Sequence, residues 1–330
     1  TVFDHFCGGV NENDCLSVVD KMYTKGVSSV LDYSVEGKEE ESQFDAALSM
    51  TLKTIEFAKE RQAIPFAVFK PTGLGRLDLY EKVGAKLTLT ASELDEWDRV
   101  VDRFDLVCKT AQFKDVALLI DAEESWMQDA ADDLVAQMMQ KYNKEKAIVF
   151  NTLQMYRWDR LDYLKQLHQK AKQEGFYIGM KIVRGAYMEK ENARAEAKGY
   201  PTPICPSKEA TDANYDAAVL YMMEHLETMA IFAGTHNESS SYALMNLMQE
   251  RNIKTNDERI WFGQLYGMSD NISYNLAANR YNVAKYLPFG PVKDVMPYLI
   301  RRAEENTSVA GQTSRELSMI KAERSRRKSL

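Results

Sequence analysis

The sequence predicts an α/β fold in which eight parallel strands and the helices between them form one (β/α)8 barrel. Eight short apolar runs recur along the 330 residues, separated by segments whose apolar residues have helical spacing. The runs hardly alternate with polar residues, which is typical of parallel strands buried on both faces. Eight βα units in a chain of this length favour a closed barrel. A doubly wound open sheet is the alternative, but no GxGxxG motif follows the first run.

Each expected element rests on a local pattern, beginning with a helical lead-in over residues 1–27. Its segment CLSVVDKMYTKG has apolar residues at helical spacing and ends at Gly26. Strands are expected at residues 28–35, in the run PFAVFK that ends at Lys70, and at 117–121, 147–152, 177–183, 229–235, 260–265 and 283–287. Helices are expected at 39–62, 89–110, 126–142, 157–173, 207–227, 239–251 and 271–279. The barrel domain is therefore expected to span residues 28–310.

A last helix is expected to begin near Val292, after the turn Pro-Phe-Gly-Pro, because a proline suits the first helical turn. One of its faces carries Tyr298, Arg301, Arg302 and Glu305 at i, i+3, i+4 and i+7. Two adjacent guanidinium groups form a fork-shaped receptor for a small carboxylate. An arginine pair on a helix is more often a solvated face, but the polar strand ends described below favour binding.

Composition and charge exclude several classes of function. The net charge of −7 argues against general nucleic-acid binding, which needs a basic face. The four cysteines have irregular spacing and no CxxC, which predicts reduced thiols in a cytosolic or matrix-like compartment. With four histidines and no HExxH motif, we expect no metal site. No apolar run approaches the ~20 residues of a membrane span, and the first residues do not resemble a signal peptide.

The chain ends in a basic tail, which we expect over residues 311–330. Its last ten residues, KAERSRRKSL, contain five basic side chains. A frayed terminus is the simpler interpretation, and a peripheral membrane contact is the functional one. The chain does not begin with Met, so a targeting segment could have been trimmed.

Polar side chains gather where the predicted strands end, which is where a (β/α)8 barrel carries its active site. In chain order these are Asp32, Tyr33, Lys70, Asp121, Glu123, Glu124, Gln154, Lys181, Arg184, Thr235, His236, Asn237, Gln264, Leu265 and Tyr286. Any one of them has a structural explanation, such as a helix cap for Asp121. Packing explains the whole set poorly, so we predict an active site here.

Two strings narrow the chemistry of this site. The string KIVRGAYMEKE places cations at a strand end, followed by a Gly-Ala pair that lets a flat ligand approach the backbone, and GTHNE adds donors and acceptors. Cations beside a flat ring that must accept negative charge suit a flavin, whose reduced form is anionic at N1 and C2=O. Together with the arginine fork and Lys70, they predict a carboxylate pocket beside an electron-accepting ring.

These residues resemble the proline dehydrogenases, also called proline oxidases, over about residues 28–306. The segments that carry the resemblance are LIDAEE, KIVRGAY, THNE, FGQLYGM and YLIRRAEEN, in this order. The resemblance implies a distorted (β/α)8 TIM-type barrel whose final helix lies over the barrel mouth. It also implies FAD-dependent oxidation of L-proline to 1-pyrroline-5-carboxylate, the first step of proline degradation to glutamate. Without a second, aldehyde-dehydrogenase-sized module in the sequence, the monofunctional form is expected.

The same resemblance implies the course of the reaction and its location. A hydride would pass from proline C5 to FAD N5 after the amine loses its proton, and a membrane quinone would then take the electrons. The expected location is cytoplasmic, with peripheral contact at the inner membrane, or on the matrix side in a eukaryote.

The resemblance also assigns roles to individual residues of this chain. Asp121 and Lys181 would be catalytic, with Lys181 beside flavin N5, where many bacterial relatives carry Arg in a string RLVKGAY. The substrate carboxylate would be bound by Lys70, Arg301 and Arg302, and its ring by Leu265, Tyr286 and Tyr298. Cofactor contacts would come from Ile120, Gln154, Arg184, Gly185, Ala186, Thr235, His236, Asn237 and Glu305. Asp32 and Glu123 would support these groups.

Two other functions remain open at this point. A hydroxyproline dehydrogenase of the same family would differ at Tyr286, where a bulky ring crowds the C4 side of the substrate and favours proline. A barrel that binds a carboxylate without turnover is the other alternative. The presence of Asp121, Lys181, Arg301 and Arg302 together argues against it.

Overall fold

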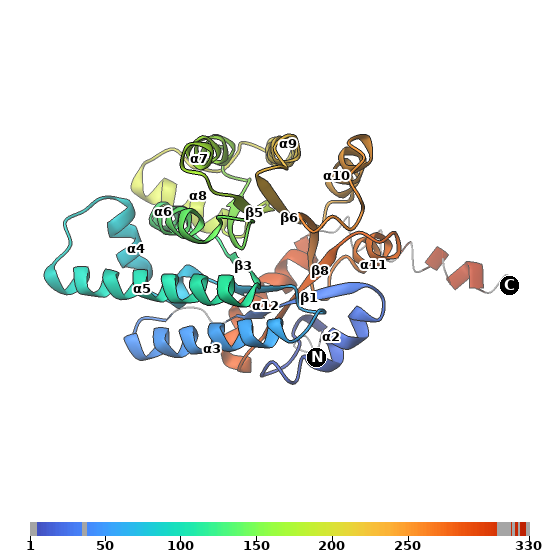
Figure 1. The fold of residues 1–330 in the computed structure, drawn as a ribbon, viewed down its shortest axis with the longest axis horizontal. Helices are drawn as coiled ribbons and strands as arrows, with labels where there is room; N and C mark the ends of the chain where they lie inside the picture. The colour runs from blue at the N-terminus through green and yellow to red at the C-terminus, as the bar shows by residue number, and fades with distance from the viewer. Residues whose placement is uncertain (1–4, 35–37, 309–317, 319–320, 323, 328–330) are drawn as a thin grey trace.

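The computed structural model describes residues 5–34, 38–308, 318, 321–322 and 324–327, apart from the side chains of 302–308. Its eight strands form one closed, wholly parallel barrel in sequential order (Figure 1). They are β1 (Val27–Tyr33), β2 (Phe66–Phe69), β3 (Ala117–Ile120), β4 (Val149–Gln154), β5 (Ile178–Val183), β6 (Met229–Gly234), β7 (Ile260–Leu265) and β8 (Val283–Phe289). All seven residues of β1 are in register with those of β8, which closes the barrel. The predicted (β/α)8 fold is confirmed.

Helices surround the barrel on the outside, except for the last one, α12 (Val292–Ser308), which follows the carboxyl end of β8 and places Tyr298 and Arg301 at that end of the barrel (Figure 1). They are α2 (Leu16–Tyr23), α3 (Glu41–Lys59), α4 (Leu77–Gly84), α5 (Ala91–Lys114), α6 (Ser125–Tyr142), α7 (Arg160–Glu174), α8 (Met188–Lys198), α9 (Lys208–Glu224), α10 (Glu238–Glu250), α11 (Asp270–Ala278) and α12 (Val292–Ser308). Two of them, α4 and α8, were not predicted. Within α8 the buried residues are Glu191 and Ala195, so its sequence shows no apolar stripe.

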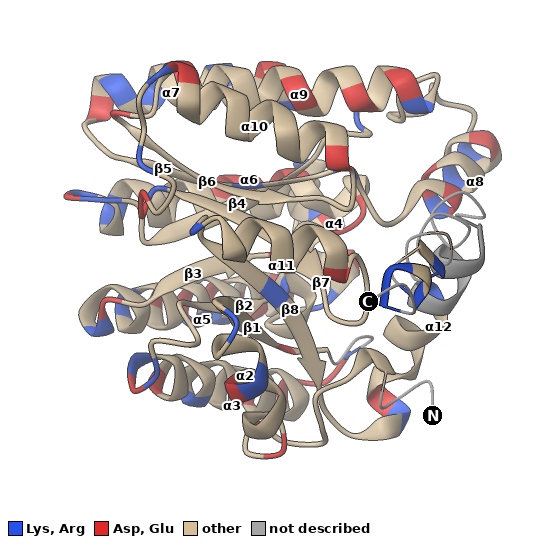
Figure 2. Cartoon of the chain, turned by 90° about the vertical axis from the view of Figure 1, so that its right-hand side faces the viewer, with Lys and Arg blue, Asp and Glu red and all other residues tan. Residues whose placement is uncertain are grey.

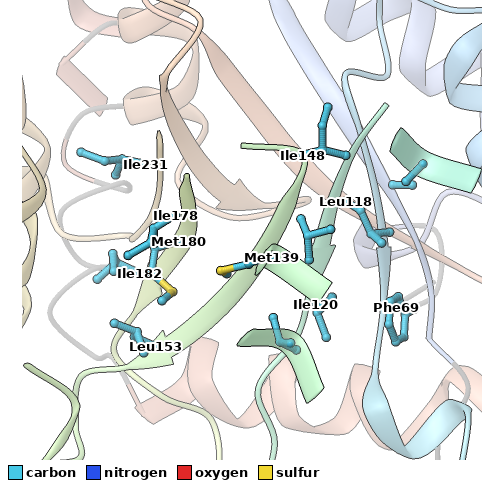
Figure 3. Close-up of a cluster of buried hydrophobic side chains, with 14 of the residues drawn as sticks. Phe69, Leu118, Ile120, Met139, Ile148, Leu153, Ile178, Met180, Ile182 and Ile231 are labelled. Carbon is cyan, nitrogen blue, oxygen red and sulfur yellow. The ribbon is translucent and has the colours of Figure 1, made fainter. Parts of the chain in front are cut away.

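The apolar strands are buried on both faces, as their sequences predicted. Nine residues fill the barrel interior, among them Phe66, Phe150, Phe232 and Tyr286. A larger cluster lies between the strands and the outer helices, and Figure 3 shows part of it around β3, β4 and β5. Inside the barrel the rings need space: a Cβ on Gly263 would lie 2.2 Å from the ring of Phe232. This glycine therefore allows the aromatic packing at the centre.

The N-terminal segment ties α12 to the end of β8. Gly8 N–H donates to the carbonyl of Pro288 (2.8 Å), and Gly290 N–H donates to the carbonyl of Gly9 (3.1 Å). Phe6 and Cys7 pack against the inner face of α12, in one cluster with Met268, Val295, Tyr298 and Leu299. The first residues thus help to fix the helix that carries the predicted arginine fork.

Charge is distributed over the outer helices without a single basic face in the view of Figure 2. In that view α8 and α12 lie at the same end of the molecule. Of the basic tail, Lys321, Arg324, Arg326 and Arg327 are exposed in short helical pieces, and Lys328 lies outside the described residues. Over the described ranges, no helix is both long and apolar enough to cross a bilayer.

Candidate active site

A cavity of about 740 Å³ opens at the carboxyl ends of the strands. It is large enough for a cofactor and a small substrate together. Most of the predicted site residues line it, namely Lys70, Asp121, Gln154, Lys181, Arg184, Gly185, Ala186, Thr235, His236, Asn237, Leu265, Tyr286, Tyr298 and Arg301. The structure thus brings together residues that are up to about 230 positions apart in sequence.

Three predicted residues do not appear on this lining. Ile120 packs into the outer core instead, and its carbonyl accepts a hydrogen bond of 2.7 Å from the Thr152 hydroxyl. Its side chain therefore does not reach the cavity from the end of β3. Arg302 and Glu305 lie on α12, but their side chains are outside the part of the chain that the structure describes.

Asp121 is the centre of the charged groups in the cavity. Its Oδ2 accepts a hydrogen bond of 3.1 Å from Lys70 Nζ, and its Oδ1 pairs with Lys181. The Tyr286 hydroxyl lies 3.2 Å from Oδ1 and accepts a bond of 2.8 Å from Lys181 Nζ. Four residues from β3, β5, β8 and the end of β2 therefore share one buried network, because parallel strands end at the same rim.

The environment sets the protonation of this network. Burial raises the pKa of the Asp121 carboxyl, but attraction to Lys181 and Lys70 outweighs it and holds the pKa below its usual value. Burial lowers the pKa of Lys181, although Asp121 opposes this effect. The pKa of the Tyr286 hydroxyl lies well above its usual value, first because of burial and then because of Asp121. Asp121 is thus an ionised acceptor and Tyr286 a neutral phenol.

Lys70 is held between two carboxylates. Its Nζ lies 3.1 Å from Asp121 and 3.3 Å from Oδ2 of Asp32, which also accepts a bond of 2.7 Å from the Ser34 hydroxyl. Asp32 therefore lies beside Lys70 at the cavity, next to the groups that it was predicted to support. The ammonium of Lys70 stays on the cavity wall, where it can still attract an anion.

At the end of the neighbouring strand β4, Gln154 and the loop after β5 form a cradle. The Gln154 amide donates to the carbonyl of Glu123 (2.8 Å) and accepts from the N–H of Ala186 (3.1 Å). Gly185 has φ +144, and a Cβ there would lie 2.5 Å from the ring of Tyr156. Only glycine fits this position, because its φ is positive and any side chain would meet Tyr156.

Arg184 and the β6–α10 turn form the next part of the wall. The guanidinium of Arg184 donates to Asp212 (2.6 Å), to the Thr235 hydroxyl (2.7 Å) and to the Ser240 hydroxyl (3.0 Å). Asn237 caps α10 by accepting from the N–H of Ser240 (3.1 Å). The groups predicted to bind the nucleotide therefore lie on a turn that is fixed from both sides.

Sequence reasoning missed several groups that shape the site. Tyr187 and Lys208 line the cavity, and Lys208 forms an ion pair of 2.6 Å with Asp212 at i+4 on α9. Glu191 is fully buried and accepts bonds of 2.6 Å from the N–H and hydroxyl of Ser125, at the start of α6. The i, i+4 spacing of Lys208 and Asp212 could have indicated their ion pair. Ser125 and Glu191 lie 66 residues apart, so no local pattern indicates their contact.

Glu123, which follows Asp121 by two positions, is a buried carboxyl. The Thr72 N–H donates to its Oε2 (2.9 Å), and the Thr72 hydroxyl lies 2.5 Å from its Oε1. Burial raises the pKa of Glu123 from its ordinary 4.5 to about 7, although the bonds from Thr72 act in the opposite direction. Between pH 4.5 and about pH 7, Glu123 is therefore protonated in the folded protein and ionised in the unfolded chain.

This difference predicts a pH dependence of stability. Stability due to Glu123 is fully present below pH 4.5 and is lost as the pH rises through about 7. Between pH 5 and 8 the free energy of unfolding of wild type should fall by about 2 kcal/mol more than that of Glu123→Gln. Urea unfolding of both proteins at several pH values measures this. Parallel pH profiles would contradict the assigned protonation.

The closed parallel barrel, with a charged cavity at the carboxyl ends of its strands, defines an enzyme of the (β/α)8-barrel class. A family model described as "Proline dehydrogenase" matches residues 15–315. The chain belongs to the proline dehydrogenase family.

The chain is similar to several proteins of known name, two of which carry the name of the family. The chain is 36% identical to "Carbapenem antibiotics biosynthesis protein CarD" of Pectobacterium carotovorum, over 98% of this chain and 83% of that protein. It is 40% identical to "Proline dehydrogenase 1, mitochondrial" of Homo sapiens, over 72% of this chain and 40% of that protein. For the protein of the same name in Dictyostelium discoideum the identity is 31%, over 98% of this chain and 64% of that protein. The chain thus covers less than two thirds of both mitochondrial relatives.

A solved structure of similar fold is that of proline utilization A (PutA) from Bdellovibrio bacteriovorus inactivated by N-propargylglycine. Its TM-score is 0.83 at 21% identity, over 94% of this chain and 33% of that one. At this level of identity the likeness supports the fold alone.

Proposed function

We propose that this protein oxidises L-proline to 1-pyrroline-5-carboxylate with FAD as its cofactor. The observation that carries the proposal is the Asp121 network: one carboxylate held between Lys70 and Lys181, inside a cavity that Arg301 also lines. In a chain of the proline dehydrogenase family, this arrangement supports an anionic amino-acid substrate beside an electron acceptor.

The residues present fit FAD. The cradle of Gln154 and Ala186 offers an amide edge, and Gly185, which has no side chain, lines the cavity beside it. Lys208, Thr235, His236 and Asn237 line the same cavity further along, where they would face the polar nucleotide portion. When bound, FAD would accept the hydride that leaves the substrate, and with it the two electrons of the oxidation.

The residues of this chain would orient the substrate. Arg301 and Lys70 would bind the carboxylate, while Tyr286, Tyr298 and Leu265 would enclose the pyrrolidine ring. Binding energy at the carboxylate would then fix the carbon from which the hydride leaves. Lys181 would stabilise the negative charge that develops on the acceptor side, because it is a buried cation in a site of low dielectric.

For the electrons, we propose a membrane quinone as the final acceptor, with peripheral contact through the basic tail. Lys321, Arg324, Arg326 and Arg327 are exposed, and each basic group near an anionic leaflet contributes about 1 kcal/mol. The net charge of −7 opposes membrane approach by the rest of the molecule. Equal co-sedimentation with anionic vesicles by the full chain and by a chain lacking residues 321–330 would refute the contact.

The test of the proposed function is a visible spectrum of the purified protein before and after anaerobic addition of L-proline. We expect a yellow protein whose flavin band bleaches with proline and stays unchanged with an equal amount of D-proline. A yellow protein that L-proline does not bleach would favour the non-catalytic alternative. A colourless protein that takes up no added FAD would refute the cofactor.

The family alternative, oxidation of hydroxyproline, depends on Tyr286. Its ring lies in the barrel interior, 6.0 Å from that of Phe232, and its hydroxyl contacts Lys181 and Asp121. A fixed ring of this size leaves little space for a 4-hydroxyl group. Tyr286→Ser should therefore raise the hydroxyproline-to-proline ratio of kcat/KM by roughly 10–200-fold.

Steady-state kinetics with both substrates measure this ratio, and Tyr286→Phe is the matched control. It keeps the ring and removes only the hydroxyl, so we expect it to change the ratio little even if it slows turnover. A ratio that shifts towards proline in Tyr286→Ser would place the selectivity elsewhere.

A further inference from the structure

Strand β8 contains a buried lysine, Lys285, that the proposed reaction does not use. The side chain of Lys285 is 1% exposed, and its Nζ donates to the carbonyl of Met268 at 2.7 Å. It also forms an ion pair with Asp270, the first residue of α11. Both partners belong to the turn that joins β7 to α11.

Lys285 points away from the barrel interior. Its neighbours Ala284 and Tyr286 belong to the interior cluster, whereas Val283 and Leu287, at the alternate positions, belong to the outer core. An apolar side chain at position 285 would therefore suit its surroundings. A buried ammonium is costly unless it is hydrogen-bonded, so its presence indicates a specific role for the bond to the turn.

The turn itself needs outside support. Gly267 and Ser269 both have positive φ, at +79 and +53. The left-handed region disfavours a residue with a side chain, such as Ser269. A Cβ on Gly267 would lie 2.4 Å from the carbonyl oxygen of His5, so the N-terminal segment covers this turn closely. Lys285 holds it from the opposite, strand side.

Both portions of the cavity depend on this turn. The Ser269 hydroxyl lies 2.8 Å from Nδ1 of His236, which lines the proposed cofactor portion. Met268 packs in one cluster with Tyr298 and Leu299 of α12, and Tyr298 lines the proposed substrate portion. Displacement of residues 266–270 would therefore move one wall in each portion.

We propose that Lys285 is a positioning residue: it fixes the β7–α11 turn, and through that turn it holds His236 and Tyr298 at the cavity wall. The roles of these two residues rest on the proposed function. The bond to the Met268 carbonyl carries most of the effect, because the side chain of Asp270 is 66% exposed and water screens its charge. Loss of the ammonium should thus matter far more than loss of the Asp270 charge.

The test compares Lys285→Met and Asp270→Asn with wild type, each purified as holoenzyme. Lys285→Met keeps the apolar stem and removes the donor. In Lys285→Met we expect faster amide hydrogen exchange over residues 266–272 and a raised KM for L-proline. On dilution, FAD should leave this variant at an enzyme concentration about tenfold higher than for wild type. Asp270→Asn should stay within about threefold of wild type in all three measurements. If Lys285→Met does not fold, Lys285→Gln is measured in its place.

Asn143→Ala is the control for general loss of stability. Asn143 is buried at the opposite end of the barrel, where its amide donates to the carbonyl of Val149, at the start of β4, and to that of Tyr177, just before β5. The Asn143→Ala variant should have a lower unfolding temperature, with FAD dissociation and amide hydrogen exchange over residues 266–272 as in wild type. Equal FAD loss in Asn143→Ala and Lys285→Met, or wild-type behaviour of Lys285→Met, would overturn the positioning role. A wild-type protein that binds no FAD would instead overturn the proposed function, and the exchange data would still decide whether Lys285 anchors the turn.

Discussion

The Lys181→Met protein is expected to oxidise L-proline about 100-fold more slowly than wild type, with FAD still bound. Lys181 is a buried cation that contacts both Asp121 and the Tyr286 hydroxyl. Removal of one preorganised donor at the place where charge develops typically lowers kcat by about 100- to 1000-fold. Methionine matches the lysine stem, so the lost group is the ammonium alone. The reduction potential of the bound flavin should also become more negative, because a nearby positive charge is gone.

Lys181→Arg is the matched control for this result. It keeps the cation and adds a fork of donors. We expect it to retain kcat within about tenfold of wild type. In Lys181→Met, Asp121 loses one of its cationic partners, so the free energy of unfolding of this variant must be measured as well. A kcat that is unchanged in Lys181→Met would exclude the proposed electrostatic role.

The barrel could be predicted because a single physical feature recurs in every strand. Each run is apolar without alternation, since one face meets the interior cluster and the other meets the helices. The short helix α8 escaped prediction for the opposite reason. Glu191 of α8 bonds Ser125, and Arg194 of α8 pairs with Glu81. Polar contacts thus hold this helix in place, where most helices use an apolar stripe. Such contacts have no period that a sequence can show.

The positions of the site residues could be predicted better than their partners. Strand ends share one rim in a parallel barrel, so Lys70, Asp121 and Lys181 were expected together before any distance was known. The pairing of Lys285 with the β7–α11 turn was not expected. In the sequence, a lysine within an apolar strand cannot be distinguished from a lysine at a strand end that reaches solvent. Burial distinguishes the two cases, and burial depends on the packing of α11 against β8.

Substitution of Arg301 by methionine is expected to raise KM for L-proline at least tenfold, while kcat changes much less. Arg301 lies on α12, is partly buried and lines the cavity together with Tyr298. Truncation of one partner in a desolvated charge pair costs about 2–5 kcal/mol, and the lower value already exceeds a tenfold change. The contact with the carboxylate is already made when the substrate binds, so most of the loss should appear in KM and only the loss of orientation in kcat.

Lys293→Met is the matched control for Arg301→Met. Lys293 is a cation on the same helix, but it is exposed on the outer face of α12. Its removal should leave KM within about twofold of wild type, as expected for an exposed charge. Arg302→Met tests the second half of the predicted fork in the same assay. The flavin spectrum of every variant shows whether the cofactor is retained. An unchanged KM in both arginine variants would remove the carboxylate clamp from the site, and the substrate carboxylate would then have to bind at Lys70 alone.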